Sequence, residues 1–148
     1  MRYIMSRLGA ALAAIIAALL AGTGSVGAVP ASVRAPACDL RIVYDKPTVL
    51  APLVIADAAA VCDHAPDRHT VEFSLDYYNS GTWVRQALIY ESGVPTRGRR
   101  IDYHVSAECR VGDWRAVARA TGSMQGRPFD ARFISQTRSI SRTECPGG

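Results

Sequence analysis

The chain has 148 residues, of which 49% are hydrophobic and 20% charged, and this is enough apolar content for one domain with a core of its own. Its formal net charge is +4, from 17 basic and 13 acidic residues. Such a small surplus excludes the strongly basic composition of nucleic-acid-binding proteins, so we expect no nucleic-acid partner.

The first 28 residues have the pattern of a secretory signal peptide. Arg2 and Arg7 precede an uncharged apolar run, Leu8–Ala21, and small residues follow up to Ala28. We therefore predict cleavage after Ala28 or Ala31 and a secreted, extracellular protein. The remaining chain has fifteen basic and thirteen acidic residues, a net charge of +2. An uncleaved Leu8–Ala21 is the alternative, a membrane anchor, although its about 14 apolar residues fall short of the roughly 20 that a span needs.

Residues 29–37 are rich in Ala, Pro and Val and predict a flexible linker, and residues 38–148 then form one domain. In this domain apolar and polar residues alternate within short segments that turn residues separate. The expected strands are Cys38–Tyr44, Leu53–Val61, Val71–Tyr77, Trp83–Tyr90, Ile101–Cys109, Trp114–Ala120, Phe129–Ile134 and Ser135–Glu144.

Seven or eight short strands at nearly regular spacing predict an all-β fold, a small antiparallel β-sandwich of the immunoglobulin-like kind. One segment leaves an alternative open. Ala56–Ala60 could be helical, because alanine favours the helix.

All four cysteines, Cys38, Cys62, Cys109 and Cys145, follow the predicted signal peptide. An even number of cysteines in an exported domain predicts two disulfides. A hairpin would bring Cys38 to Cys62, which leaves Cys109 for Cys145, and this pairing is favoured. The competing bridge is Cys62–Cys109, an inter-sheet disulfide packed against a core tryptophan, Trp83 or Trp114.

Catalytic and metal-binding patterns are weak in this sequence. Asp63, His64, Asp67 and His69 form the densest group of metal-ligand residue types, but their spacing matches no known metal motif and a solvated loop is expected. His104 has no catalytic partner in its strand, and Glu72 and Asp76 share the solvated face of theirs. We therefore expect no enzymatic activity, no metal and no cofactor.

Two segments are candidate contact surfaces. Tyr77–Trp83 forms an aromatic hairpin tip, in which Tyr78 and Asn79 are expected to be exposed while Tyr77 and Trp83 enter the core. The loop Ser92–Arg100 contains the densest basic cluster, Arg97, Arg99 and Arg100, which could bind a polyanion.

The layout of an export signal followed by two sequential cysteine pairs resembles that of the small secreted protease and amylase inhibitors of filamentous soil bacteria. Trp114-Arg115-Ala116 is the nearest match to the Trp-Arg-Tyr triplet of the amylase inhibitors and lacks its tyrosine. Cys145-Pro146 lies at the end of the chain, unlike the reactive-loop cysteine of the subtilisin inhibitors. The sequence is therefore assigned to neither family.

These observations predict a secreted or envelope-associated binding domain without catalytic activity. Its partner is an unknown protein or a cell-envelope polymer. An inhibitor of a secreted hydrolase, acting through the loop Ser92–Arg100, is the alternative. A small extracellular enzyme would need a cleft around His64, His69 or His104.

Overall fold

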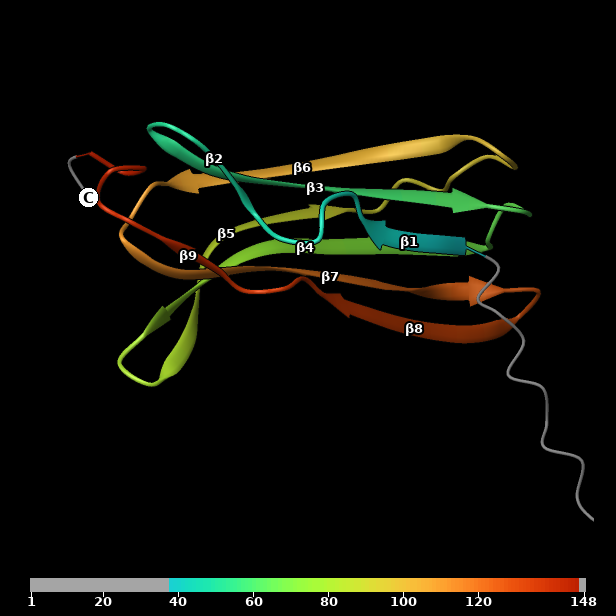
Figure 1. Cartoon of the computed structure of the whole chain (residues 1–148). Coiled ribbons are helices and arrows are strands. Elements are labelled where there is room, and N and C mark those ends of the chain that lie inside the picture. The colour runs from blue at the N-terminus through green and yellow to red at the C-terminus, as the bar shows by residue number, and fades with distance from the viewer. Residues whose placement is uncertain (1–37, 147–148) are drawn as a thin grey trace, which may run out of the picture. The chain divides into compact units, whose positions relative to one another are not determined.

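The computed structural model describes residues 38–146, and this part of the chain contains nine β-strands and no helix (Figure 1). The predicted signal peptide, 1–28, and linker, 29–37, lie outside the described residues, as do residues 147 and 148. The strands are β1 (Cys38–Ile42), β2 (Thr48–Leu50), β3 (Leu53–Cys62), β4 (Arg68–Asn79), β5 (Thr82–Glu91), β6 (Arg100–Glu108), β7 (Gly112–Met124), β8 (Arg127–Ile134) and β9 (Arg138–Ile140).

The strands form two antiparallel sheets, as the alternation pattern predicts. In the first, sheet A, β3 is central and β6 pairs along one side of it. The short strands β1 and β2 follow one another along the other side of β3. In the second, sheet B, the order is β5-β4-β7, and β8 and β9 share the far side of β7. Figure 1 shows the two sheets stacked as the layers of a sandwich.

Tight turns close the two hairpins of sheet B. Ser80 and Gly81 join β4 to β5, and Gln125 and Gly126 join β7 to β8. All four have positive φ values, between 48° and 89°. This is the geometry of type I′ turns, whose twist matches that of the flanking strands.

The core lies between the inner faces of the sheets, and small residues line its two long central strands. β3 contributes Ala56, Ala58 and Ala60, and β7 contributes alanines at 116, 118 and 120, all buried. The bulk between them comes from other strands, above all from Phe73 and Leu75 on β4. The helical alternative for Ala56–Ala60 is wrong, because burial between paired strands outweighs the weak helix propensity of alanine.

Two disulfides are present, Cys38–Cys62 and Cys109–Cys145, which is the pairing that the sequence favours. Cys38 and Cys62 are directly opposite one another on β1 and β3, so this bond links the short strand β1 covalently to the central strand of sheet A. Cys109 follows β6 and Cys145 follows β9, so the second bond ties sheet A to the end of sheet B. The Cys62–Cys109 alternative is wrong.

Disulfides of this kind form and persist in oxidising compartments, which places the domain outside the cytoplasm. Among the described residues no helix is long and apolar enough to cross a membrane. The predicted anchor, Leu8–Ala21, lies outside the described residues.

Candidate binding face

The outer face of sheet B brings aromatic and arginine side chains from several strands together. Because inner residues of β4 and β7 are buried in the core, their neighbours in sequence point outward. The strand register then sets outward residues side by side. We call this surface the sheet-B face, and its residues are Glu72, Ser74, Asp76, Tyr78, Trp83, Arg85, Leu88, Tyr90, Arg115, Val117, Arg119, Asp130, Arg132 and Ile134.

The floor of this face is buried although it lies outside the core. Ser74 and Asp76 are only 2% and 8% exposed, and Val117 is also buried. The Ser74 hydroxyl donates to Asp76 Oδ1 at 3.1 Å, and Arg115 donates to Asp76 Oδ2 at 3.4 Å. Asp76 was expected on a solvated strand face. It is instead buried, with Ser74 and Arg115 as its hydrogen-bond partners.

An aromatic and cationic stack forms one end of the face. The rings of Tyr78 and Trp83 lie opposite each other on β4 and β5, with centroids 5.1 Å apart. The guanidinium of Arg115 lies 4.3 Å from the centroid of the Trp83 ring, within cation–π range. Trp83 therefore packs against both Tyr78 and Arg115 on the outer face, and the expectation that it enters the core is wrong. Across the β4–β5 hairpin, Trp83 is paired with Tyr78, which is not a core residue.

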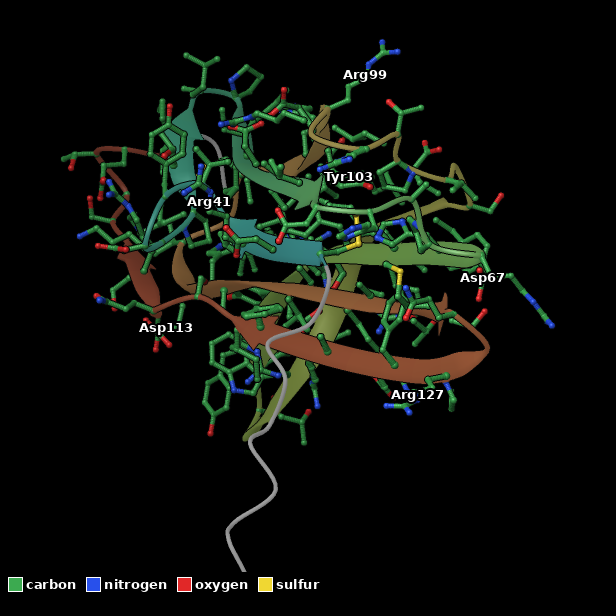
Figure 2. All side chains as sticks on the ribbon, turned by 90° about the vertical axis from the view of Figure 1, so that its right-hand side faces the viewer. Arg41, Asp67, Arg99, Tyr103, Asp113 and Arg127 are labelled. Carbon is green, nitrogen blue, oxygen red and sulfur yellow. A yellow bond between two sulfur atoms is a disulfide. The ribbon has the colours of Figure 1, made fainter. Side chains whose placement is uncertain are left out.

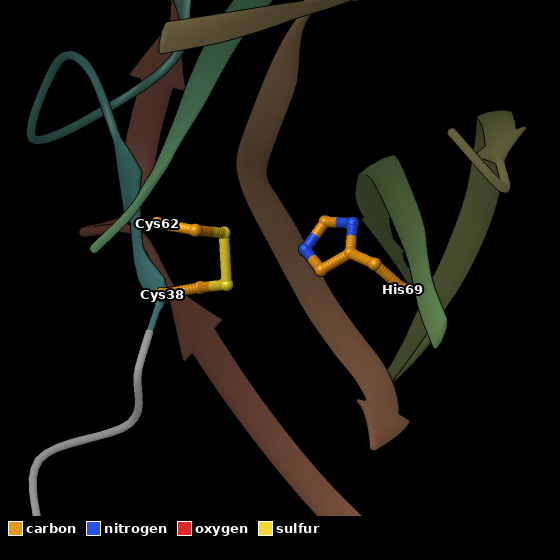
Figure 3. A group of neighbouring side chains, drawn as sticks. All are labelled: Cys38, Cys62 and His69. Atoms are coloured by element: carbon orange, nitrogen blue, oxygen red, sulfur yellow. A yellow bond between two sulfur atoms is a disulfide. The ribbon is translucent and has the colours of Figure 1, made fainter. Parts of the chain in front are cut away.

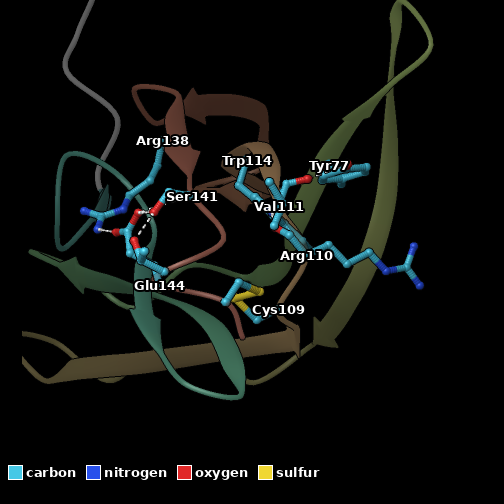
Figure 4. Close-up of a disulfide and its surroundings, with 10 residues drawn as sticks. Tyr77, Cys109, Arg110, Val111, Trp114, Arg138, Ser141 and Glu144 are labelled. Atoms are coloured by element: carbon cyan, nitrogen blue, oxygen red, sulfur yellow. Dashed lines mark hydrogen bonds and ion pairs between the residues drawn. A yellow bond between two sulfur atoms is a disulfide. The ribbon is translucent and has the colours of Figure 1, made fainter. Parts of the chain in front are cut away.

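Tyr77 faces the other way and anchors the base of this hairpin. Its ring packs against the buried Trp114 at a centroid distance of 5.1 Å, and its hydroxyl donates to the carbonyl of Val111 at 2.8 Å (Figure 4). Gly112 has a φ of +133°, and a Cβ there would lie 2.8 Å from the Tyr77 hydroxyl oxygen. Only a glycine therefore lets the Tyr77 side chain lie so close to the backbone at position 112. Past a bulge at Leu75 and Asp76, the hairpin bends away from the sandwich (Figure 1).

An open hollow of about 510 Å³ lies in the middle of the face. Ser74 and Val117 form its floor, and the residues around it are Glu72, Arg85, Leu88, Arg119, Asp130 and Arg132. Arg119 pairs with Asp130 through two hydrogen bonds, which lower the pKa of the Asp130 carboxyl. Within residues 38–146, Arg85 and Arg132 make no ion pair. The hollow therefore offers two guanidinium groups to an external anion.

The second predicted contact surface lies at the other end of the strands. Tyr78 and Asn79 are at the β4–β5 turn, whereas the loop 92–99 leaves the far end of β5. Arg99 and Arg100 border a separate hollow of about 390 Å³, and Arg100 pairs with Asp102 at 2.6 Å. Figure 2 shows the Arg99 side chain projecting into solvent at this end. The structure thus does not bring the two predicted patches together.

The loop 92–99 is nevertheless fixed to the body of the domain. Pro95 is fully buried, and Gly98 donates its N–H to the carbonyl of Cys62 at 2.8 Å. The N–H of Arg99 donates to the carbonyl of Thr96 at 3.1 Å, which makes the tip around Arg97 a tight turn.

The predicted histidine group is divided between the surface and the core. Asp63, His64 and Asp67 are exposed in the connection between β3 and β4. His69 is buried in the core, where its ring faces the Cys38–Cys62 disulfide (Figure 3). It is buried because it is on the same side of β4 as Val71 and Phe73. His104 is exposed on sheet A and pairs with Asp57 at 2.8 Å.

Sequence reasoning missed most of the sheet-B face. Alternation indicated that Arg115, Val117 and Arg119 share one side of their strand. No signal in the sequence showed that β7 lies between β4 and β8, and only that register brings Arg85, Arg119 and Arg132 around one hollow.

No protein-family model matches the chain, and no curated protein matches it. Solved structures similar to part of it include the following two. The solution structure of CsgH from R. palustris has a TM-score of 0.40 and 12% identity, covering 65% of this chain and 90% of that one. The crystal structure of a protein from Archaeoglobus fulgidus has a TM-score of 0.37 and 10% identity, covering 72% and 97% of the two chains. Likenesses this distant carry no argument about function.

Proposed function

We propose that this chain is a non-catalytic binding domain of an exported protein, and that its sheet-B face holds an acidic, partly apolar segment of a partner protein. The observation that supports this most is the hollow with Arg85 and Arg132 on opposite sides, neither of them in an ion pair within residues 38–146.

The charge of the face favours an anionic ligand. Asp76 and Asp130 are already neutralised by Arg115 and Arg119. What remains is Arg85 and Arg132 against the single carboxylate of Glu72. A carboxylate that enters between the two free arginines would make charge-assisted hydrogen bonds, which are stronger than neutral ones.

Exposed apolar side chains lie on the same face, and one of them, Leu88, lines the hollow. Leu88 is 45% exposed, Ile134 50% and Tyr90 63%. Leu88 and Ile134 are in one cross-strand row with Ser74 and Val117, on either side of the floor. Apolar residues placed between cations suit a peptide with both acidic and apolar side chains.

A polysaccharide fits this face less well, because sugar rings stack their apolar C–H faces on free aromatic rings. Trp83 has one face covered by the Arg115 guanidinium, and Tyr78 packs against the same indole. The Trp83 ring therefore stabilises the hairpin by these contacts and leaves little free surface for a sugar ring to stack on.

The positions of the histidines support a non-catalytic role. His69 is buried, His64 is in an exposed connection, and His104 pairs with Asp57 on the outside of sheet A. His104 also lines a hollow of about 340 Å³ between the edges of β5 and β6. An enzyme built on these groups would need a nucleophile beside one of them.

Inhibition of a secreted hydrolase is the second candidate function, because the loop 92–99 is held in one shape by buried Pro95 and by Gly98. Its tip is a tight turn, whereas peptide grooves take extended segments. This geometry makes inhibition the weaker proposal.

The test is a calorimetric titration with a short synthetic peptide that has glutamate at alternate positions and leucine or serine between them. We expect binding that weakens as salt screens the charges. The double variant Arg85→Gln/Arg132→Gln should weaken it by about tenfold or more, roughly 1.4 kcal/mol.

The matched control is Arg97→Gln/Arg99→Gln, which removes the same charge at the other end of the strands. It should leave the affinity unchanged. Equal losses in both double variants would mean unspecific charge attraction and would refute the proposed face. If an anionic polysaccharide binds as tightly as the peptide, and with the same variant sensitivity, the partner is a polymer and not a protein segment.

A further inference from the structure

The buried group around the first disulfide brings three potential metal ligands together from both sheets. Cys38 and Cys62 belong to β1 and β3 of sheet A, and His69 belongs to β4 of sheet B. Their sulfur and nitrogen ligand atoms all lie within 4.8 Å of one another. All three residues are more than nine-tenths buried.

The hydrogen bonding of His69 leaves one nitrogen aimed at the sulfurs. Its Nδ1 lies 3.3 Å from the carbonyl oxygen of Gly93, and since that oxygen can only accept, Nδ1 carries the proton. Its Nε2 is buried and has no hydrogen-bond partner among residues 38–146. Figure 3 shows the ring turned toward the disulfide. Burial also lowers the pKa of His69, which favours the neutral ring with a lone pair on Nε2.

This arrangement is the one that metal-binding histidines use. Such histidines donate the N–H of one ring nitrogen to a backbone carbonyl or a carboxylate, which fixes the ring while the other nitrogen binds the ion. A buried, unpartnered nitrogen is otherwise unfavourable, because it has lost its contact with water and gained nothing in return.

We propose that reduction of the Cys38–Cys62 disulfide converts this group into a Zn²⁺ site, with Cys38 Sγ, Cys62 Sγ and His69 Nε2 as ligands. The oxidised form offers no thiolate and holds no ion. A dithiol reductant supplies two electrons and two protons, so that it becomes a disulfide and the two cysteines become thiols. Zn²⁺ then displaces both thiol protons as it binds.

The chemistry and spacing suit zinc. Thiolate sulfur and imidazole nitrogen are the ligands of structural zinc sites, at roughly 2.3 Å and 2.0 Å from the ion. Tetrahedral angles then put the two sulfurs about 3.7 Å apart, and each sulfur about 3.5 Å from the nitrogen. Cysteines directly opposite one another on antiparallel strands can reach that separation by side-chain rotation alone. Two thiolates also neutralise the ion, so the core would contain no net charge.

The experiment reduces the protein with a water-soluble phosphine, which takes up oxygen from water as it cleaves the disulfide and does not compete strongly for zinc. Co²⁺ is the first probe, because its sulfur charge-transfer absorption reports thiolate ligation, and Zn²⁺ is then added to displace it. We expect one equivalent of Co²⁺ to bind the reduced chain and none to bind the oxidised chain.

Two variants identify the ligands. His69→Gln should weaken Zn²⁺ binding by more than about 100-fold, whereas His64→Gln, at the exposed histidine five residues earlier, should not change it. Cys38→Ser/Cys62→Ser keeps the other cysteine pair and should abolish the thiolate absorption. Circular dichroism of each oxidised variant checks that its fold persists.

Three results would overturn this site. The reduced chain could bind no Co²⁺, whether folded or unfolded. His69→Gln could bind as tightly as the wild type. The thiolate absorption could persist in Cys38→Ser/Cys62→Ser, which would assign it to Cys109 and Cys145.

Discussion

At the scale of single residues, Gly122 shows how little room the paired strands of sheet B leave. It lies on β7 opposite His69, and a Cβ at this position would run into the carbonyl oxygen of Arg68 and the ring of Phe129. Gly122→Ala should therefore lower the free energy of unfolding by about 2–4 kcal/mol, because backbone and ring must both shift. Chemical denaturation monitored by circular dichroism measures this.

Gly93→Ala is the matched control for that substitution. A Cβ at Gly93 would meet nothing within 4 Å. The free energy of unfolding should then change by no more than about 0.5 kcal/mol. If both variants were equally destabilised, the cause would be the loss of glycine itself and not the contact in sheet B.

Glu144 gives the fold a dependence on acid. The backbone N–H of Ser141, then its hydroxyl, then Arg138 all donate to this carboxylate (Figure 4), and together they lower its pKa from 4.5 to about 2. A carboxyl with a lowered pKa in the folded state stabilises the fold above pH 4.5, and this stabilisation is lost as the pH falls from 4.5 toward 2.

Glu144→Gln should therefore lose less stability between about pH 6 and pH 3 than the wild type does. Thermal melts at a series of pH values test this. The control is Glu108→Gln, an exposed glutamate whose side chain makes no ion pair within residues 38–146. A wild-type acid profile that Glu144→Gln leaves unchanged would contradict the role of this carboxylate.

Which side chains are buried was predictable for most strands but not for His69 and Trp83. Alternation places His69 with Val71 and Phe73, yet its polar ring and its polar neighbours in sequence suggested a loop. For Trp83, the alternation along the hairpin suggested the core, while the register pairs it with the outward-facing Tyr78. Both outcomes depend on contacts that form only in the folded domain, which residue type alone does not specify.

At the scale of elements, the alanine-rich β3 has no clear alternation and left a helical alternative open. The other long strands followed from the sequence because each alternates between apolar and polar residues. The two shortest strands did not. β2 and β9 have three residues each, too few for a period to be visible. The sequence predicts a polar strand over Ser135–Glu144, but β9 covers only Arg138–Ile140. The chain then turns at Ser141, whose backbone N–H donates to the Glu144 carboxylate.

The disulfide between β1 and β3 should be important for the stability of sheet A. It closes a loop with a sequence separation of 24 residues, which on chain-entropy grounds is worth about 3–4 kcal/mol. Cys38→Ser/Cys62→Ser should lose about that much free energy of unfolding in urea. A loss below about 1 kcal/mol would mean that β1 stays paired with β3 through its backbone hydrogen bonds alone.

At the scale of the whole domain, the pairing of strands from different parts of the chain decides where binding residues gather. The exposed segments that the sequence singled out, around Tyr78 and around Arg99, lie at opposite ends of the strands. The hollow between them combines residues of β4, β5, β7 and β8, and none of these strands shows it alone. The fold class could therefore be predicted from the alternation of apolar and polar residues. The candidate binding face could be found only once the pairing register of the strands was known.

The sheet-B face is the central claim, and the most direct test is a map of backbone amide shifts in the nuclear magnetic resonance spectrum as the acidic peptide is added. We predict that the largest changes fall at Ser74, Arg85, Leu88, Arg119 and Arg132, around the hollow. Changes confined to the loop 92–99, or spread evenly over all exposed arginines, would contradict the proposed face.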